Sequence, residues 1–430
     1  MPTPKQTILL LTTPQSYRTP AFQAAANTLG LHLLTIVDLP DALATEWQLK
    51  HALNFSHPDA ATHLTTLAQQ NNARAIIAVD DSGGQLAATA SANLGLPHNN
   101  PNAALAARDK HLMRQQLSTG GALCPHFQLA HTGDDFTTLA TQIDYPCVVK
   151  PTRLSGSRGV IRANSPAEFI TAAGRLTRIL TDLRGPGSHP FLIEEYIPGV
   201  EVALEGLMDN GRCHILALFD KPDPLDGPFF EETIYVTPSR LPPASQAEIA
   251  TQTALAAQAL GLRHGPIHAE LRLNNNGAYI VEIAGRSIGG LCSRILNFTL
   301  ESATQETDDP QNATASLEEL ILRQLVQASL PLNREPQARG VMMIPIPQAG
   351  LLRHVNGLDD ARAIPGIDDI EITAKENYPL VPLPEGDSYL GFIFAHGDTP
   401  TTVENTLRAA ANQLHYTIDP IIPLSLRTLP

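Results

Sequence analysis

The stretch "HAELRLNNNGAYIVEIAGR", residues 268–286, contains two glutamates on either side of a strong turn signal. Asn274-Asn275-Asn276-Gly277 is turn chemistry between two strand-like runs, which predicts a β-hairpin. If the loop is centred on residue 276, Glu270 lies directly opposite Glu282, because each is six residues from the centre.

Side chains alternate between the two faces of a strand, so this register sorts the rest of the hairpin. One face is expected to carry Ile267, Ala269, Leu271, Leu273, Tyr279, Val281 and Ile283, and the other His268, Glu270, Arg272, Ile280 and Glu282. Like charges opposed on a sheet are destabilising, and at about 5 Å and an effective dielectric of about 20 the repulsion is roughly 3 kcal/mol. Mg²⁺ between the carboxylates would offset it. The structural alternative is an exposed glutamate or a salt bridge to Arg272 or Arg286.

Composition narrows the class of protein. The chain has 430 residues, enough for two to four domains, and a formal charge of −14, which disfavours nucleic acid or an anionic membrane as partner. No leader and no apolar run approaching about 18 residues is apparent, so we expect a cytoplasmic protein. The four cysteines include no CxxC pair, which favours reduced thiols over a zinc site.

Periodicity predicts an α/β protein with four parts. Strand and helix patterns alternate in residues 1–100, as in a Rossmann-like parallel-sheet domain, although the first turn lacks the glycines of a dinucleotide site. Residues 335–430 are expected to form an α+β lid, and a family resemblance, which rests on the motifs of the intervening chain, implies two further domains, residues 101–186 and residues 187–310 with the hairpin.

Particular elements are expected within these parts. Helices are predicted over residues 100–117, 165–180, 245–260 and 401–414, and strands over residues 6–13, 31–37, 73–80, 145–151, 340–346 and 389–395. Two strands with a tight connection are expected within residues 191–208. Residues 221–243 form a proline-rich loop of the kind that carries function, and residues 303–316 read as a polar linker.

Positive charge is concentrated in one segment of this acidic chain. Between Lys150 and Gly185 there are seven basic residues and two acidic ones, which suggests a small anionic ligand. The same segment contains the loop "TRLSGSRGV", whose backbone N–H groups and arginines suit phosphate.

The order and spacing of these motifs resemble the ATP-grasp superfamily over roughly residues 1–310. The resemblance implies that Lys110 and Lys150 contact ATP phosphates and that a flexible loop closes over them. Further implied ATP contacts are Ser155, Gly156, Ser157, Arg158 and Gly159 in that loop, Glu194 at the adenine amino group, the Glu195 and Ile197 backbones at the ring, and Glu201 at the ribose. Glu270 and Glu282 match the two metal-binding acidic positions.

Within the superfamily, "GPIHAELRL…GAYIVEIAGRSIGG" is most similar to the L-amino-acid (dipeptide) ligase and carnosine-synthase branch. This similarity assigns Arg286, Gly289 and Gly290 to the acyl phosphate and a substrate carboxylate, and Glu232 to the metal. Two positions depart from the pattern. Ala284 stands where many relatives have an asparagine ligand, and Tyr235 stands at a substrate position where relatives often have histidine.

The resemblance implies an ATP-dependent carboxylate–amine ligase that works through an acyl phosphate and releases ADP and phosphate. Arg286 and Lys150 would be catalytic, ATP and Mg²⁺ (or Mn²⁺) the cofactors, and a small acid and amine the substrates; a homodimer is left open. A carboxylase-like enzyme that phosphorylates bicarbonate, and a nucleotide-binding protein without turnover, are the alternatives. His268 is expected to be a hydrogen-bonding neighbour of the site rather than a ligand.

Overall fold

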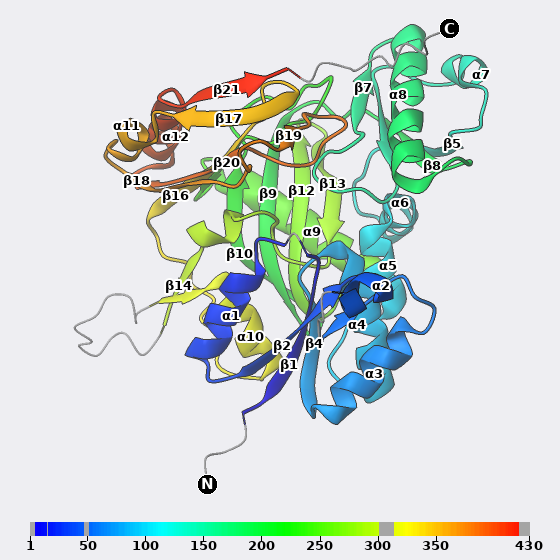
Figure 1. The fold of residues 1–430 in the computed structure, drawn as a ribbon. Coiled ribbons are helices and arrows are strands. Elements are labelled where there is room, and N and C mark those ends of the chain that lie inside the picture. Colours follow the sequence, from blue (N-terminus) through cyan, green and yellow to red (C-terminus); the bar gives the residue numbers. More distant parts are fainter. Residues whose placement is uncertain (1–4, 15, 47–50, 301–313, 421–430) are drawn as a thin grey trace, which may run out of the picture. The chain divides into compact units, whose positions relative to one another are not determined.

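A computed structural model describes residues 5–14, 16–46, 51–300 and 314–420 of the chain (Figure 1). The chain divides into two compact units, each built from three segments. Unit 1 comprises Met1–Pro125, Ile197–Phe219 and Arg240–Pro336, and unit 2 comprises His126–Tyr196, Asp220–Ser239 and Gln337–Pro430. Most of the predicted linker, residues 303–313, lies outside the described residues.

Unit 1 begins with a parallel sheet of order β3-β2-β1-β4, which confirms the predicted α/β class. Its strands are β1 (Thr7–Thr12), β2 (His32–Asp38), β3 (Ala52–Leu53) and β4 (Ala73–Ala78), and its helices are α1 (Thr19–Thr28), α2 (Asp41–Glu46), α3 (Ala60–Gln70) and α4 (Asp81–Leu94). All six side chains of β1 are buried, as expected for a central parallel strand.

Unit 1 continues with strands in the order β13-β12-β9-β10. These are β9 (Val200–Asp209), β10 (Arg212–Asp220), β12 (Gly265–Asn274) and β13 (Gly277–Ala284), accompanied by α5 (Pro101–Arg108), α6 (Lys110–Gly120), α9 (Pro243–Leu260), η1 (Cys292–Ile295), β14 (Asn297–Thr299), β15 (Thr314–Ser316) and α10 (Leu317–Leu325). Alternate residues of β12, namely Ile267, Ala269 and Leu271, are fully buried in one core with α9 residues such as Ile249 and Ala256.

The predicted single helix over residues 100–117 is wrong, because α5 and α6 are separate helices. Asp109 between them has an extended backbone, and its carboxylate accepts hydrogen bonds from the N–H groups of His111 and Leu112. This is an N-cap, which starts a new helix rather than continuing the old one. The break places Lys110 at the first position of α6.

The hairpin of β12 and β13 pairs Glu270 directly with Glu282, as predicted, but reaches that register differently. Asn274 pairs with Gly277, and a bulge then shifts the register by one residue between Leu271↔Ile280 and Glu270↔Glu282. Between the turn and the bulge, the predicted assignment of the β13 side chains to the two faces of the hairpin is therefore wrong. Ile280 is fully buried in the core and does not share the glutamate face, whereas Tyr279 is only half-buried.

Unit 2 contains a sheet of order β5-β8-β6-β7, against which α8 packs Phe169 and Leu176. Its elements are β5 (Phe127–His131), α7 (Phe136–Ala140), β6 (Cys147–Pro151), β7 (Ile161–Ala163), α8 (Pro166–Arg184) and β8 (Pro190–Glu195). As predicted, α8 begins after Ser165, whose Oγ accepts from the Glu168 N–H.

The rest of unit 2 consists of antiparallel strands ordered β11-β16-β20-β18 and a small sheet, β19-β17-β21. These elements are β11 (Ile234–Thr237), β16 (Ala338–Ile344), β17 (Gly350–Asn356), α11 (Leu358–Arg362), β18 (Ile367–Ile372), β19 (Pro379–Leu380), β20 (Gly391–Gly397), α12 (Pro400–Ala411) and β21 (His415–Asp419). Among the described helices of both units, none is both long and apolar enough to cross a membrane.

Candidate active site

The two opposed glutamates of the hairpin each meet a cation. Lys110 Nζ lies 3.1 Å from Glu282 Oε2, and His268 Nε2 lies 3.6 Å from Glu270 Oε1. Lys110 is nearly buried, so its charge acts at short range and in a weakly screened environment. These two cations offset the carboxylate repulsion; the sequence indicated His268 as a hydrogen-bonding neighbour of the site but did not indicate Lys110 as a partner of Glu282.

His268 is buried between two carboxylates. Its Nδ1 lies 3.1 Å from Glu205 Oε2, on β9, and its other ring nitrogen faces Glu270. Burial lowers the pKa of His268, but the hydrogen bonds and charges of Glu205 and Glu270 outweigh it and raise the pKa to about 9. The imidazole is therefore cationic at neutral pH and links β9 to the metal-site candidate Glu270.

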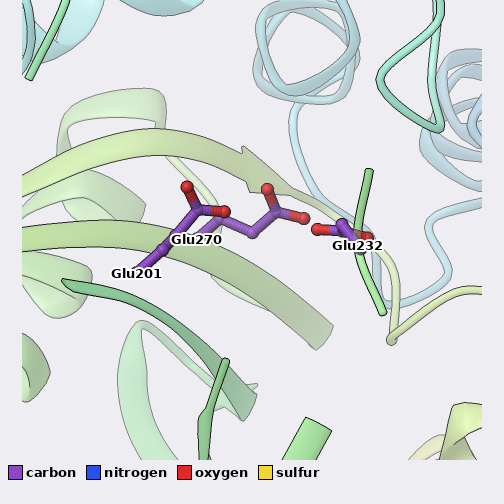
Figure 2. A group of neighbouring side chains, drawn as sticks. All are labelled: Glu201, Glu232 and Glu270. Atoms are coloured by element: carbon purple, nitrogen blue, oxygen red, sulfur yellow. The ribbon is translucent and has the colours of Figure 1, made fainter. Parts of the chain in front are cut away.

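Glu201 and Glu270 lie on the same face of neighbouring strands, β9 and β12. Glu201 pairs in register with Arg272, and Arg272 Nε donates to Glu201 Oε2 over 2.8 Å. Glu201 and Glu270 each have a carboxylate oxygen within 4.8 Å of the other's (Figure 2). Arg272 also donates to the Ile197 carbonyl, so it is buried and ion-paired rather than solvated.

The acidic face of unit 1 fits a divalent cation by its donor chemistry. Glu201, Glu270 and Glu282 supply hard carboxylate oxygens from a rigid sheet, which is the ligand type that Mg²⁺ and Mn²⁺ prefer. Ala284, opposite His268 in the register, offers no side-chain oxygen. In unit 2, Glu232 is held by the ammonium group of Lys221.

Arg286 follows β13 directly and lies among acidic groups of unit 1. Its Nε donates to Asp81 Oδ1 over 2.8 Å, and its Nη1 donates to the Ser287 carbonyl over 3.0 Å. Burial lowers the pKa of Arg286, but the charges of Asp81, Glu282 and Glu205 together raise it above its ordinary value. Asp81, in the first turn of α4, was missed by sequence reasoning because it is about 200 residues away in the chain.

The loop after Arg286 is held in place by buried polar side chains from three other elements. Arg18, before α1, donates to the Ser287 carbonyl and hydroxyl. The Ile288 N–H donates to Glu205 Oε2, and Ser293 Oγ donates to Glu318 Oε1 on α10. The predicted substrate residues Gly289 and Gly290 lie within this anchored loop, and Gly290 has a left-handed backbone with φ of +58°.

In unit 2, Lys150 and Glu194 form a buried ion pair between adjacent strands β6 and β8. Lys150 Nζ lies 2.6 Å from Glu194 Oε2, and the two side chains are 5% and 3% exposed. The neighbouring Glu195 N–H donates to the His126 carbonyl. The strand lysine and the first hinge glutamate, which the sequence assigned to different parts of ATP, are thus direct partners.

The glycine loop, residues 155–159, is docked on the 382–387 segment of the same unit. The Gly159 N–H donates to the Pro384 carbonyl, and Arg158 Nη1 lies 3.6 Å from Asp387 Oδ2. Gly156, Ser157 and Gly159 all have positive φ angles. A Cβ on Gly159 would also lie 2.9 Å from a Leu176 methyl, so glycine is required there.

The substrate candidate Tyr235 is almost fully buried on β11. The Lys221 ammonium lies 5.0 Å from the centre of its ring and also binds Glu232. Asp223 accepts from Thr233 and from Arg408 on α12, so the start of the proline-rich segment is tied to two other parts of unit 2.

Two segments of the chain match models of known protein domains. Residues 143–295 match the ATP-grasp domain, and residues 342–419 match the L-amino acid ligase C-terminal domain 2. Residues 143–295 are therefore similar to an ATP-grasp domain. Residues 342–419 are similar to a domain of L-amino acid ligases, which agrees with the branch that the hairpin segment resembles.

Individual relatives support this placement. Alanine–anticapsin ligase of Bacillus subtilis (strain 168) is 28% identical over a segment that covers 47% of this chain and 46% of that protein. Dapdiamide A synthase of Enterobacter agglomerans is 28% identical over a segment that covers 63% of this chain and 64% of that protein. The chain thus spans about half to two thirds of these relatives. The crystal structure of an L-amino acid ligase from Bacillus licheniformis superposes with a TM-score of 0.75, covering 97% of this chain and 100% of that one at 23% identity, which shows the shared fold.

Proposed function

We propose that the protein is an ATP-dependent carboxylate–amine ligase that joins a small acid, such as an amino acid, to an amine. The observation that carries the proposal is the direct register of Glu270 and Glu282, flanked by Lys110 and followed by Arg286. A carboxylate oxygen of the acid attacks the γ-phosphorus of ATP, and the bond from phosphorus to the bridging oxygen breaks to release ADP. The amine then attacks the acyl carbon, phosphate leaves, and the amine loses a proton.

The residues of this chain would act by position and charge, because phosphoryl transfer requires little covalent chemistry from the protein. Lys150 and Lys110 would each bind phosphate oxygens of ATP. On binding, Lys150 would leave its partner Glu194 and Lys110 would leave its partner Glu282. Arg286 would hold the acid's carboxylate. Mg²⁺ on Glu270 and Glu282, with Glu201 beside them, would neutralise charge on the phosphoryl group, and Glu232 stays the further metal ligand that the family resemblance implies.

Other expected contacts belong to the same proposal. Glu194 and the Glu195 and Ile197 backbones would bind adenine, Glu201 is the carboxylate expected at the ribose, and residues 155–159 would close over the phosphates. Gly289, Gly290 and Tyr235 would contribute to the substrate site. We expect the enzyme to act on small molecules, without nucleic acid or membrane partners, in the cytoplasm.

A carboxylase-like activity is the alternative within the fold. A carboxyaminoimidazole ribonucleotide synthase from Aspergillus clavatus, solved with ATP, superposes with a TM-score of 0.69 over 96% of this chain at 15% identity. The ligase is favoured because the C-terminal domain match and the relatives above are of ligase type.

Product analysis tests the proposal. Purified protein is incubated with ATP, Mg²⁺ and pairs of amino acids, and nucleotides and amides are separated by chromatography. We expect ADP and phosphate to accumulate in proportion to amide. An AMP peak that grows with amide would contradict the acyl-phosphate route, stimulation of ADP release by bicarbonate alone would favour the carboxylase, and ATP binding without turnover would favour a binding protein.

A further inference from the structure

Glu205 on β9 is fully buried, and it is not among the residues expected to contact ATP, metal or substrate. One of its oxygens, Oε2, accepts two hydrogen bonds from different parts of unit 1, from His268 Nδ1 over 3.1 Å and from the Ile288 N–H over 3.0 Å. The other oxygen, Oε1, is buried and has no hydrogen-bond partner among the described residues. Burying a carboxylate with one oxygen unpaired is unfavourable for stability, so Glu205 is better explained by what it holds in place.

The first of these contacts leads to the proposed metal site. Glu205 and His268 are direct partners in the register of β9 and β12, and the other ring nitrogen of His268 lies 3.6 Å from Glu270 Oε1. Ala284, the partner of His268 on the other side, has no polar side chain, so the imidazole is oriented from β9. Metal-binding groups are commonly oriented by hydrogen bonds from such a second layer of residues.

The second contact leads to the loop that follows Arg286. The Ile288 N–H lies two residues beyond that arginine, and the residue between them, Ser287, is held separately by the buried guanidinium of Arg18. One atom of Glu205 therefore accepts from both the hairpin of β12 and β13 and this loop. If either donor is displaced, the shared oxygen moves and the other contact changes as well.

We propose that Glu205 is a positioning residue that fixes the proposed metal ligand Glu270 relative to the loop after Arg286. It acts through His268 on one side and through the Ile288 N–H on the other. Transfer of a phosphoryl group to an acid requires the metal and the acid's carboxylate in a narrow geometry, since a displacement of about 1 Å can cost roughly a hundredfold in rate. The inference rests on the proposed ligase function and adds a residue that acts through its neighbours.

Glu205→Leu tests the proposal, because leucine fills the buried site without an acceptor oxygen. Amide hydrogen exchange over residues 286–290 is measured in the protein free of metal and nucleotide. We expect exchange to be roughly ten- to a hundredfold faster than in the wild type, because a hydrogen bond to a charged group is lost. This measurement depends on neither metal nor turnover.

Two further measurements follow the same variant. Calorimetric titration with Mn²⁺ in the presence of ADP reports the metal site, and its affinity should fall by roughly tenfold. Steady-state kinetics use the acid and amine that release most ADP in the product analysis above. We expect kcat/KM for the acid to fall by roughly tenfold or more, whereas the KM for ATP at saturating Mg²⁺ should stay unchanged.

A double-variant cycle separates the two contacts of Glu205. His268→Phe keeps a flat ring and removes both nitrogens. In the His268→Phe background, Glu205→Leu should have no further effect on Mn²⁺ affinity, because Glu205 acts on Glu270 through the imidazole, but it should still accelerate exchange over residues 286–290. Glu205→Gln retains one oxygen that can accept both hydrogen bonds, so its exchange and Mn²⁺ affinity should lie between those of the wild type and Glu205→Leu.

Glu319→Leu is the matched control. Glu319 on α10 is also a buried carboxylate of unit 1, and Arg323 Nη2 lies 2.7 Å from its Oε1. Its substitution should destabilise unit 1 while leaving loop exchange, Mn²⁺ affinity and kcat/KM as in the wild type.

A Glu205→Leu protein that unfolds more easily but keeps wild-type loop exchange, Mn²⁺ affinity and kcat/KM would show that Glu205 is only structural, and the inference would be wrong while the ligase function stands. Equal changes in Glu319→Leu would attribute the effects to general destabilisation and would also overturn it. If the wild type releases no ADP with any acid and amine, the ligase function fails, and the role of Glu205 in the reaction fails with it.

Discussion

Glu270 and Glu282 are direct partners in the register of β12 and β13, and each carries a different compensating cation. The nearly buried Lys110 faces Glu282, whereas His268 approaches Glu270 at the longer distance of 3.6 Å. The two acids therefore occupy equivalent positions in the register, but a different cation relies on each of them for charge compensation. Substitution should separate these roles.

Glu282→Gln should destabilise the metal-free protein by about 1–3 kcal/mol, because Lys110 loses its charged partner in a buried setting. Glu270→Gln should have a smaller effect on unfolding, because its carboxylate is more loosely paired. Both variants should raise the Mg²⁺ concentration needed for half-maximal turnover and lower the maximal rate. Denaturant unfolding without metal and Mg²⁺ titration of activity measure the two effects, and an unchanged Mg²⁺ requirement in both variants would contradict the metal assignment.

Lys150→Ala should weaken nucleotide binding and also destabilise unit 2. Removing one partner of a buried ion pair leaves the other charge uncompensated, at a cost of about 3–5 kcal/mol. The double variant Lys150→Met/Glu194→Gln removes both charges and should recover most of that stability without recovering ATP affinity. Unfolding curves and calorimetric titration with ATP test this, and normal nucleotide affinity in the folded double variant would exclude Lys150 from phosphate binding.

The sequence predicted the acidic hairpin well because turn chemistry and period-two alternation are local signals. The sequence placed Ile280 on the wrong face of the hairpin because no residue type near Val281 signals a β-bulge there. Two tertiary hydrogen bonds lie beside the bulge: the buried Arg114 donates to the Val281 carbonyl over 2.5 Å, and the Ile280 N–H donates to the Leu123 carbonyl. Contacts of this kind join distant parts of the chain and cannot be read from local pattern.

Candidate site residues were predictable to different degrees for the same reason. Glu270, Glu282 and Lys150 each lie in a motif that is contained in one short stretch of sequence, so local pattern is enough to find them. Asp81 and Arg18 belong to the first domain by sequence, and only the fold brings them to Arg286 and Ser287.

Attachment of the 382–387 segment, which contacts the glycine loop, to Arg175 on α8 should depend on pH. Arg175 Nε and Nη2 donate to the two carboxylate oxygens of Glu385 over 2.6 and 2.8 Å. This hydrogen bonding lowers the pKa of Glu385 below its usual value of 4.5. Because the folded-state pKa is depressed, the contact contributes stability above about pH 4.5 and loses it as the pH falls through the lower value.

Hydrogen exchange over residues 382–387, measured between about pH 3 and pH 7, should show faster opening at the acid end. Glu385→Gln should open faster already at pH 7. Asp398→Asn, a carboxylate at an exposed position elsewhere in unit 2, serves as the control and should behave as the wild type. Equal exchange in Glu385→Gln and the wild type would show that the ion pair does not hold the segment.

Arg286→Lys should damage turnover more than ATP binding. Arginine supplies Nε to Asp81 and Nη1 to the Ser287 carbonyl and still presents Nη2, whereas lysine offers one ammonium that cannot reproduce this fork. Loss of a charged hydrogen bond to the acid substrate corresponds to about 1.5–3 kcal/mol, or roughly ten- to a hundredfold in kcat/KM for that substrate. Steady-state kinetics with varied acid, together with calorimetry for ATP, separate the two effects. Arg74→Lys, at an exposed position on β4, should leave both unchanged, and an ATP affinity that falls as far as kcat/KM would place Arg286 at the nucleotide instead of the acid.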